Sequence, residues 1–84
     1  MEKQIGQVTH YFNRLGVAVL ELTDGIKVGD NVHFLGYTTD FTQAVWSMEI
    51  EHRKLQAVGP GADVALEVVE PVRKGDRVYK IESE

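Results

Sequence analysis

The chain has 84 residues, of which 43% are apolar and 26% are charged, and its formal net charge is −4. This balance is typical of one small globular domain and is too apolar for a disordered tail. The negative charge disfavours sequence-independent binding to a phosphate backbone, and the absence of cysteine excludes disulfides and thiolate metal sites.

Apolar and polar residues alternate with a period of two along most of the chain, which predicts strands rather than helices. Six segments follow this pattern: 5–12, 16–22, 31–35, 41–52, 63–69 and 77–81. Turn residues separate several of them, such as the Thr23-Asp24-Gly25 and Gly59-Pro60-Gly61 sequences. We therefore expect six strands joined by short turns.

The fourth segment does not alternate cleanly. Val45 and Met48 are three residues apart, so they would lie on opposite faces of a regular strand. One extra residue near Trp46 and Ser47, a β-bulge, would return both to the same face. Barrels use such bulges to bend a long strand, so the pattern favours a bulged strand here.

A short internal repeat supports this architecture. Residues 26–32 read Ile-Lys-Val-Gly-Asp-Asn-Val, and residues 72–78 read Val-Arg-Lys-Gly-Asp-Arg-Val. Glycine adopts positive φ at little cost and aspartate accepts hydrogen bonds from nearby backbone, so each Gly-Asp pair predicts a tight turn into the next strand. We predict an all-β fold, a single domain over residues 1–84 with its core at about 5–81. The expected form is a small closed six-stranded Greek-key-type β-barrel, because closure leaves few unpaired edges.

The order of these turns resembles a known family. Residues 25–32, then Val45 and Met48, then 61–66 and 75–78 resemble domain 2 of elongation factor Tu, a translation-protein barrel. The resemblance covers residues 5–81, and the chain looks closest to proteins described as translation elongation factor-like. The chain is also similar to the small barrel at the C-terminus of some collagenase-like peptidases. The chain departs from the translation pattern at Gly61, which precedes Ala62 instead of aspartate, and its hairpin at 10–16 does not carry over the family's tRNA contacts.

Motifs for catalysis are absent from the sequence. It has no Gly-x-x-x-x-Gly-Lys-Ser/Thr loop to hold phosphates, so we expect no nucleotide hydrolysis. Neither Ser47 nor Ser83 lies in a Gly-x-Ser-x-Gly elbow. The three histidines, His10, His33 and His52, match no metal-ligand spacing, and His10 is expected to be half-buried. We therefore expect no enzyme activity, no metal and no cofactor.

A few residues are candidates for partner contacts. Trp46 is either a core residue or an exposed contact, depending on the bulge, and Tyr37 lies in a loop where exposure is favoured. Two basic pairs, Arg53-Lys54 and Arg73-Lys74, would form a positive patch if their segments adjoin. The alternative is that they are ordinary solvated turns.

The resemblance implies a non-enzymatic, stand-alone binding barrel that contacts RNA or a protein of the translation apparatus. The alternative is an accessory subunit of an enzyme, such as a collagenase-like peptidase whose relatives carry this barrel. A barrel that binds a small ligand ranks last, because the interior of a barrel with so few strands is filled by its own side chains. With no cysteine, no membrane span and no signal peptide, we expect a cytoplasmic protein.

Overall fold

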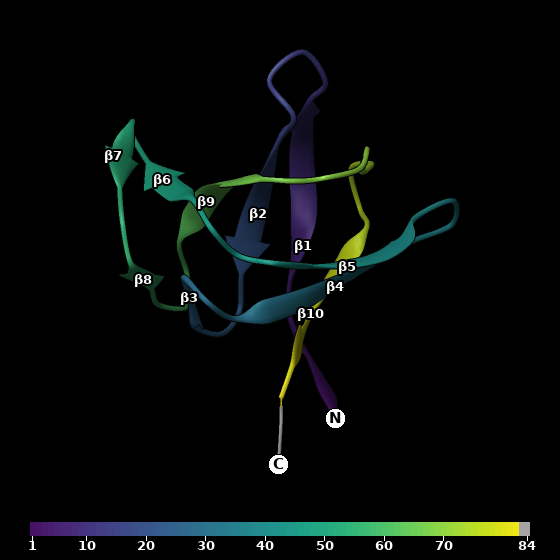
Figure 1. Cartoon of the computed structure of the whole chain (residues 1–84), viewed down its shortest axis with the longest axis horizontal. Helices are drawn as coiled ribbons and strands as arrows, with labels where there is room; N and C mark the ends of the chain where they lie inside the picture. Colours follow the sequence, from purple (N-terminus) through teal and green to yellow (C-terminus); the bar gives the residue numbers. More distant parts are fainter. Residues whose placement is uncertain (83–84) are drawn as a thin grey trace.

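The structure, a computed structural model, describes residues 1–82 and consists of antiparallel strands and turns (Figure 1). The longer strands are β1 (Glu2–Phe12), β2 (Val17–Leu22), β4 (Asn31–Leu35), β5 (Asp40–Ala44), β9 (Asp63–Glu67) and β10 (Arg77–Ile81). The shorter ones are β3 (Ile26–Lys27), β6 (Met48–Ile50), β7 (Arg53–Lys54) and β8 (Ala57–Val58). The all-β prediction is confirmed. No helix within the described residues is long and apolar enough to cross a membrane.

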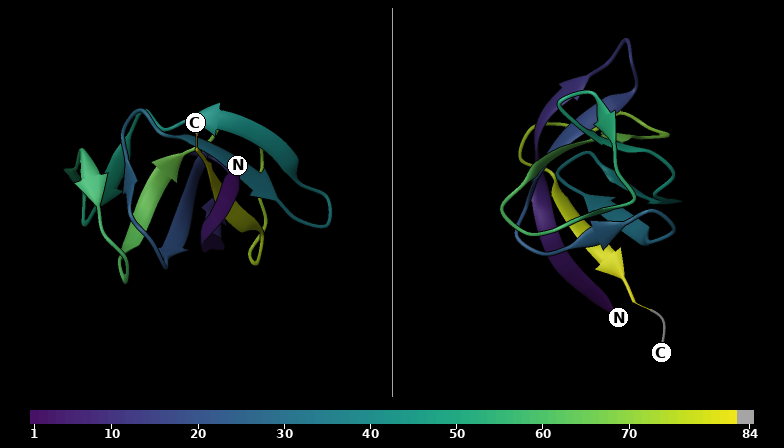
Figure 2. Two further views of the ribbon diagram at one scale, coloured as in Figure 1. Left: turned by 90° about the horizontal axis from the view of Figure 1, so that it is seen from below. Right: turned by 90° about the vertical axis from the view of Figure 1, so that its left-hand side faces the viewer.

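One curved sheet makes up most of the fold. Its strand order is β5-β4-β10-β1-β2-β9-β6-β7, and β3 pairs with β8 separately. The sheet curls around a single core, as the two turned views in Figure 2 show. The start of β1 and the end of β10 lie together at one end of the molecule, where the Glu82 N–H donates to the Met1 carbonyl, and the β1–β2 hairpin projects from the other end (Figure 1).

The core follows the predicted alternation. In β4, Val32 and Phe34 are fully buried, and in β9, Val64 and Leu66 are fully buried. The intervening side chains on these strands are exposed or only partly covered. The ring of Phe34 stacks on that of Phe41 in β5, with 5.1 Å between the ring centres. Burying one face of each strand removes apolar surface from water and supplies most of the driving force for folding.

The two Gly-Asp turns are equivalent in detail, as the repeat predicts. Gly29 and Gly75 have φ values of 100° and 94°, which favour glycine. The carboxylates of Asp30 and Asp76 accept a hydrogen bond from the backbone N–H three residues earlier, at 3.0 and 2.8 Å. Each turn thus closes on its own aspartate before the next strand starts.

Each corner also bonds to a buried valine elsewhere in the chain. Val45 exchanges backbone hydrogen bonds with Gly29 and Asp30, at 2.9 and 2.8 Å. Val8 does the same with Gly75 and Asp76, at 2.8 Å each. These hydrogen bonds attach each corner to a segment that is remote in sequence. The two copies of the sequence repeat therefore make the same kind of tertiary contact.

The predicted fourth strand is broken instead of bulged. β5 ends at Ala44 and β6 begins at Met48, after which the chain pairs with β9 and no longer with β4. Val45 and Met48 are nonetheless both buried, so the expectation that they share a face is confirmed. Both side chains face the core because the chain passes from pairing with β4 to pairing with β9 between them. At the break, two backbone hydrogen bonds between Val45 and the Gly29-Asp30 corner replace the strand ladder.

The backbone ladder does not close into the predicted six-stranded ring, because β5 has only β4 as a strand partner. A side chain spans the gap. The Gln43 amide nitrogen donates to the Glu67 carbonyl at 2.8 Å, and its carbonyl oxygen accepts from the Val69 N–H at 2.8 Å. Gln43 is buried, and it satisfies two backbone groups that a neighbouring strand would otherwise satisfy.

The central strand β1 changes register twice. It slips by one residue at Ile5 against β10 and again at Thr9 against β2. At the first slip Gly6 lies so close to β2 that a Cβ atom would overlap the Glu21 carbonyl. The second slip turns His10 to the outer face, so the expectation that His10 is half-buried is wrong.

Replacing Phe34 by Ala should lower the free energy of unfolding by roughly 3–4 kcal/mol, because it removes a fully buried ring and its stack on Phe41. Urea denaturation midpoints measure the change. Val69→Ala is the control, since Val69 is 59% exposed and its loss should cost little. Similar losses in the two variants would contradict this assignment of the core.

Replacing Gln43 by Leu should lower the free energy of unfolding by about 1–3 kcal/mol, because the Val69 N–H and Glu67 carbonyl lose their partner. Hydrogen exchange at the Val69 amide should become faster in the same variant. Thr42→Leu, at the exposed neighbouring position, provides the control. Unchanged exchange at Val69 would show that Gln43 does not hold this edge.

Candidate functional site

Trp46, whose burial the sequence left open, lies in the break between β5 and β6 and is 48% exposed. Its indole N–H donates to the Glu67 carboxylate at 3.0 Å. The ring borders a shallow hollow of about 180 Å³, lined also by Lys54 and Leu55. Trp46 is therefore a surface residue with a fixed orientation, and its contact role remains a prediction.

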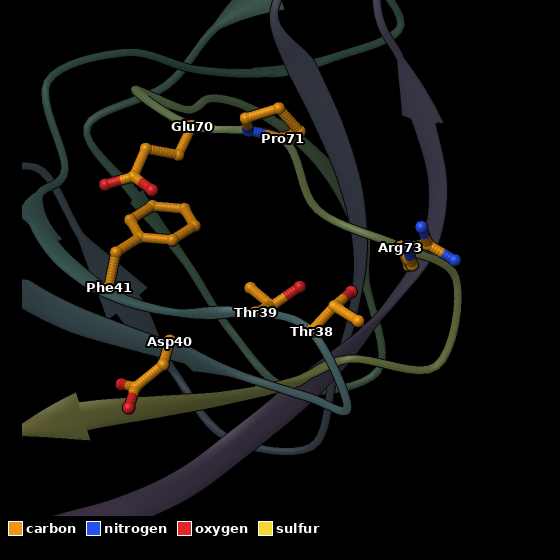
Figure 3. Close-up of a pocket in the computed structure, with 7 residues that line it drawn as sticks. All are labelled: Thr38, Thr39, Asp40, Phe41, Glu70, Pro71 and Arg73. Carbon is orange, nitrogen blue, oxygen red and sulfur yellow. The ribbon is translucent and has the colours of Figure 1, made fainter.

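Tyr37 is fully exposed in the loop between β4 and β5. Next to this loop lies an open cleft of about 390 Å³, shown in Figure 3 and lined by Thr38, Thr39, Asp40, Phe41, Glu70, Pro71 and Arg73. The β4–β5 loop and the segment after β9 form its two sides. The cleft presents hydroxyls, carboxylates and one guanidinium, so it is suited to hydrogen bonding.

The two basic pairs do not lie side by side. Arg53 and Lys54 form β7, at the far edge of the sheet. Arg73 and Lys74 occupy the turn before β10, which lies near the middle of the sheet order. Figure 1 and the left-hand view of Figure 2 show the two segments on opposite sides of the molecule, so the single positive patch considered from sequence does not form.

The polar groups of this surface show no arrangement for catalysis among the described residues. Ser47 has no hydrogen bond to a histidine or a carboxylate within residues 1–82. In the same part of the chain, no three side chains of the His, Asp or Glu type gather closely enough to hold a metal ion. Ser83, the other serine considered from sequence, lies outside the described residues.

His33 joins two carboxylates on neighbouring strands. Its Nδ1 lies 2.8 Å from Glu2 of β1, and its Nε2 lies 2.6 Å from Asp40 at the start of β5. Because carboxylates only accept, both ring nitrogens must donate, which requires the protonated imidazolium. The hydrogen bonds to Glu2 and then to Asp40 raise the pKa of His33 above its ordinary value, although partial burial opposes them.

The His33 bridge should make stability depend on pH. With a raised pKa, the folded state binds the proton more tightly than the unfolded chain. The stabilisation is therefore complete below about pH 6.5, the ordinary histidine pKa, and is lost as the pH rises through the higher pKa of the folded state. Urea midpoints between about pH 5.5 and 8.5 should fall in the wild type and change less in His33→Gln. Equal pH dependence in both proteins would contradict the bridge.

Sequence reasoning missed one surface. Phe12 and Leu15 at the β1–β2 hairpin and Val17 at the start of β2 line a groove of about 590 Å³ on the outer face of the sheet. A signal existed in the alternation, because Val17, Val19 and Ala65 occupy positions that point away from the core. Such positions carry polar residues when one face of a sheet is solvated.

No protein-family model matches the chain. It is 35% identical over 77 residues to an uncharacterized protease of Methanocaldococcus jannaschii, a match over 90% of this chain and 19% of that protein. It is 31% identical over 80 residues to a collagenase of Porphyromonas gingivalis, covering 93% of this chain and 22% of the relative. The chain thus spans about a fifth of the length of these curated relatives.

A solved structure is similar along nearly its whole length. It is the C-terminal domain of a Geobacillus thermoleovorans protein described as a U32 peptidase, with a TM-score of 0.87 and 26% sequence identity. The match covers 93% of this chain and 91% of that domain. The fold of this chain is therefore one that occurs as a domain at the end of a peptidase.

These relatives overturn the resemblance to domain 2 of elongation factor Tu and the proposed role in translation, since the matches are to peptidase proteins and a peptidase domain. The physical reason is that Gly-Asp turns with evenly spaced apolar residues specify the corners of a curved sheet, and unrelated functions share that geometry. The alternative reading from sequence, a domain associated with collagenase-like peptidases, is the one that the comparisons favour.

Proposed function

We propose that this chain is a non-catalytic accessory module of a U32-type peptidase and that it acts by binding protein. The observation that carries the proposal is the match to a separate C-terminal domain of such a peptidase, which covers over nine-tenths of both chains. The curated relatives support it, because the chain corresponds to about a fifth of a protease and of a collagenase. Catalytic residues then belong to the remainder of such proteins.

The chemistry of the chain supports a binding role. The cleft beside Tyr37 is open and offers hydrogen-bonding groups, and Ser47 lacks the neighbouring base that nucleophilic catalysis needs. Trp46, Tyr37, Arg53, Lys54, Arg73 and Lys74 stay candidate contacts, in separate places on the surface. A module of this kind contributes affinity or orientation to the enzyme that it accompanies.

We further infer that the curved sheet is a closed six-stranded barrel in which a side-chain bridge takes the place of the missing strand pairing. Its longer strands number six within the described residues, and Gln43 bridges the gap that the ladder leaves between β5 and the end of β9. Such closure protects the edge of β5 from pairing with other chains. A reducing cytoplasm suits the cysteine-free composition, and we propose that location.

The proposal predicts a direct complex with a peptidase. The probe is a purified U32 peptidase from the organism that makes this chain, with any segment that matches the chain removed. Biolayer interferometry should give a Kd that changes only modestly between about 0.05 and 0.5 M salt, because a protein interface with few charge pairs loses little affinity to screening. Purified tRNA is the comparison partner and should not bind.

Binding to tRNA with a steep loss at the higher salt concentration, and none to the peptidase, would contradict the proposal. Peptide hydrolysis by the isolated chain would contradict its non-catalytic part. A suitable assay is cleavage of denatured collagen, with a heat-inactivated sample of the chain as the control.

A further inference from the structure

The outer face of the sheet is apolar beside the β1–β2 hairpin. In β2, Val17 and Val19 point away from the core, and in β9, Ala65 does the same. Val19 lies opposite Ala65 in the register of the two strands. Solvated faces of antiparallel sheets normally carry polar side chains at such positions, so this part of the face is suited to being covered.

The register slip in β1 extends this face. After the extra residue Thr9, His10 and Phe12 point outward, opposite Val19 and Val17. The ring centres of His10 and Phe12 are 4.3 Å apart, and the Phe12 side chain remains 44% exposed. Without the slip the parity of β1 would be reversed and Phe12 would point toward the core. The slip therefore places an aromatic ring on the surface.

The face is a groove with two walls. One wall is the hairpin, with Phe12 and with Leu15, which is 71% exposed. The other is formed by His52 in the turn between β6 and β7 and by Lys54 in β7. The small side chain of Ala65 leaves the hollow between them, which measures about 590 Å³. This volume holds a few side chains and not a whole domain face, so the groove fits a protruding or extended segment.

The β6–β7 wall is held in an uncommon conformation. Glu51 and His52 both have positive φ, at 50° and 65°, as a two-residue hairpin turn of this hand requires. Asparagine and glycine adopt it more readily than glutamate and histidine do. The backbone bond from Leu55 N–H to the Met48 carbonyl, at 3.0 Å, fixes the turn and with it the position of His52.

The charges of the groove define what it binds. Two carboxylates, Glu49 and Glu67, face a single lysine, Lys54, and the chain as a whole has a charge of −4. Glu67 is engaged by the Trp46 indole, whereas Glu49 makes none of the ion pairs among residues 1–82. The complementary ligand is an apolar segment that carries a basic residue. A second copy of this chain would bring its own excess of carboxylates and is disfavoured.

The groove lies far from the first and last described residues. Met1 and Glu82 lie at the opposite end of the molecule from the hairpin (Figure 1). The protease and collagenase relatives contain several times the length of this chain, so a peptidase partner has ample polypeptide to supply a protruding segment.

We propose that the groove between the β1–β2 hairpin and the β6–β7 turn is the surface that binds the peptidase. It accepts an apolar segment of the peptidase whose basic residue meets Glu49. This inference rests on the proposed function and names its surface and the chemistry of the bound segment.

Two groove variants and one charge-matched variant of a competing surface test the inference. Leu15→Asp places a charge on the hairpin wall, and Glu49→Lys reverses the charge of a β6 side chain that lines the groove. Tyr37→Asp places the same charge as Leu15→Asp at a competing candidate contact, the fully exposed side chain in the loop between β4 and β5. All three side chains are outside the core, and equal urea midpoints would verify that each variant folds.

The truncated U32 peptidase described above is the binding probe, and biolayer interferometry gives each Kd. We expect Leu15→Asp to weaken binding at least about tenfold and Glu49→Lys about threefold or more, with Tyr37→Asp within about twofold of the wild type. Hydrogen exchange at residues 12–17 should slow in the complex.

Wild-type binding that both groove variants retain would overturn the inference and leave the proposed function standing. The same holds if Tyr37→Asp alone abolishes binding, because the cleft beside that loop would then be the contact. No binding by the wild type would overturn the proposed function, and the inference that rests on it would fall too.

Discussion

The structure depends on how β1 runs through the centre of the sheet. It is the longest strand, it pairs with both β10 and β2, and its two single-residue slips decide which of its side chains face the core. The slip at Ile5 requires a residue without a side chain at Gly6, and the slip at Thr9 turns Phe12 outward. Since a strand has a side-chain period of two, one extra residue reverses every position beyond it. Ile5 and Val8 of β1 are therefore in the core and Tyr11 packs against it, whereas His10 and Phe12 lie on the surface.

A domain this small must satisfy the edges and corners of its sheet with few residues. Two Gly-Asp corners each bond to a buried valine from a distant strand, and Gln43 supplies two hydrogen bonds where no strand is available. These contacts are polar and mostly backbone, and they enclose a core of aliphatic side chains and two stacked phenylalanine rings. The division is economical, because apolar burial drives folding while the polar contacts fix a single topology.

The surface carries several separate features. The polar cleft beside Tyr37, the Trp46 hollow and the apolar groove below the hairpin occupy different parts of the sheet. Only the last two adjoin, since Lys54 and Glu67 line both. The Glu67 carboxylate that accepts from the Trp46 indole is therefore also part of the groove, which places Trp46 beside it.

The sequence determined the all-β class, the two equivalent corners and the inward positions of Val45 and Met48, because alternation and Gly-Asp turns are local properties. It did not determine the break after Ala44, the Gln43 bridge or the distance between the two basic pairs, since these depend on which strands become neighbours. The slip that exposes His10 and Phe12 is also a tertiary result, because it arises from pairing with β2 and leaves no mark in the residues themselves. The resemblance to a translation barrel was wrong for a related reason. Corner motifs indicate where a sheet bends, whereas its surface forms only when distant strands become neighbours.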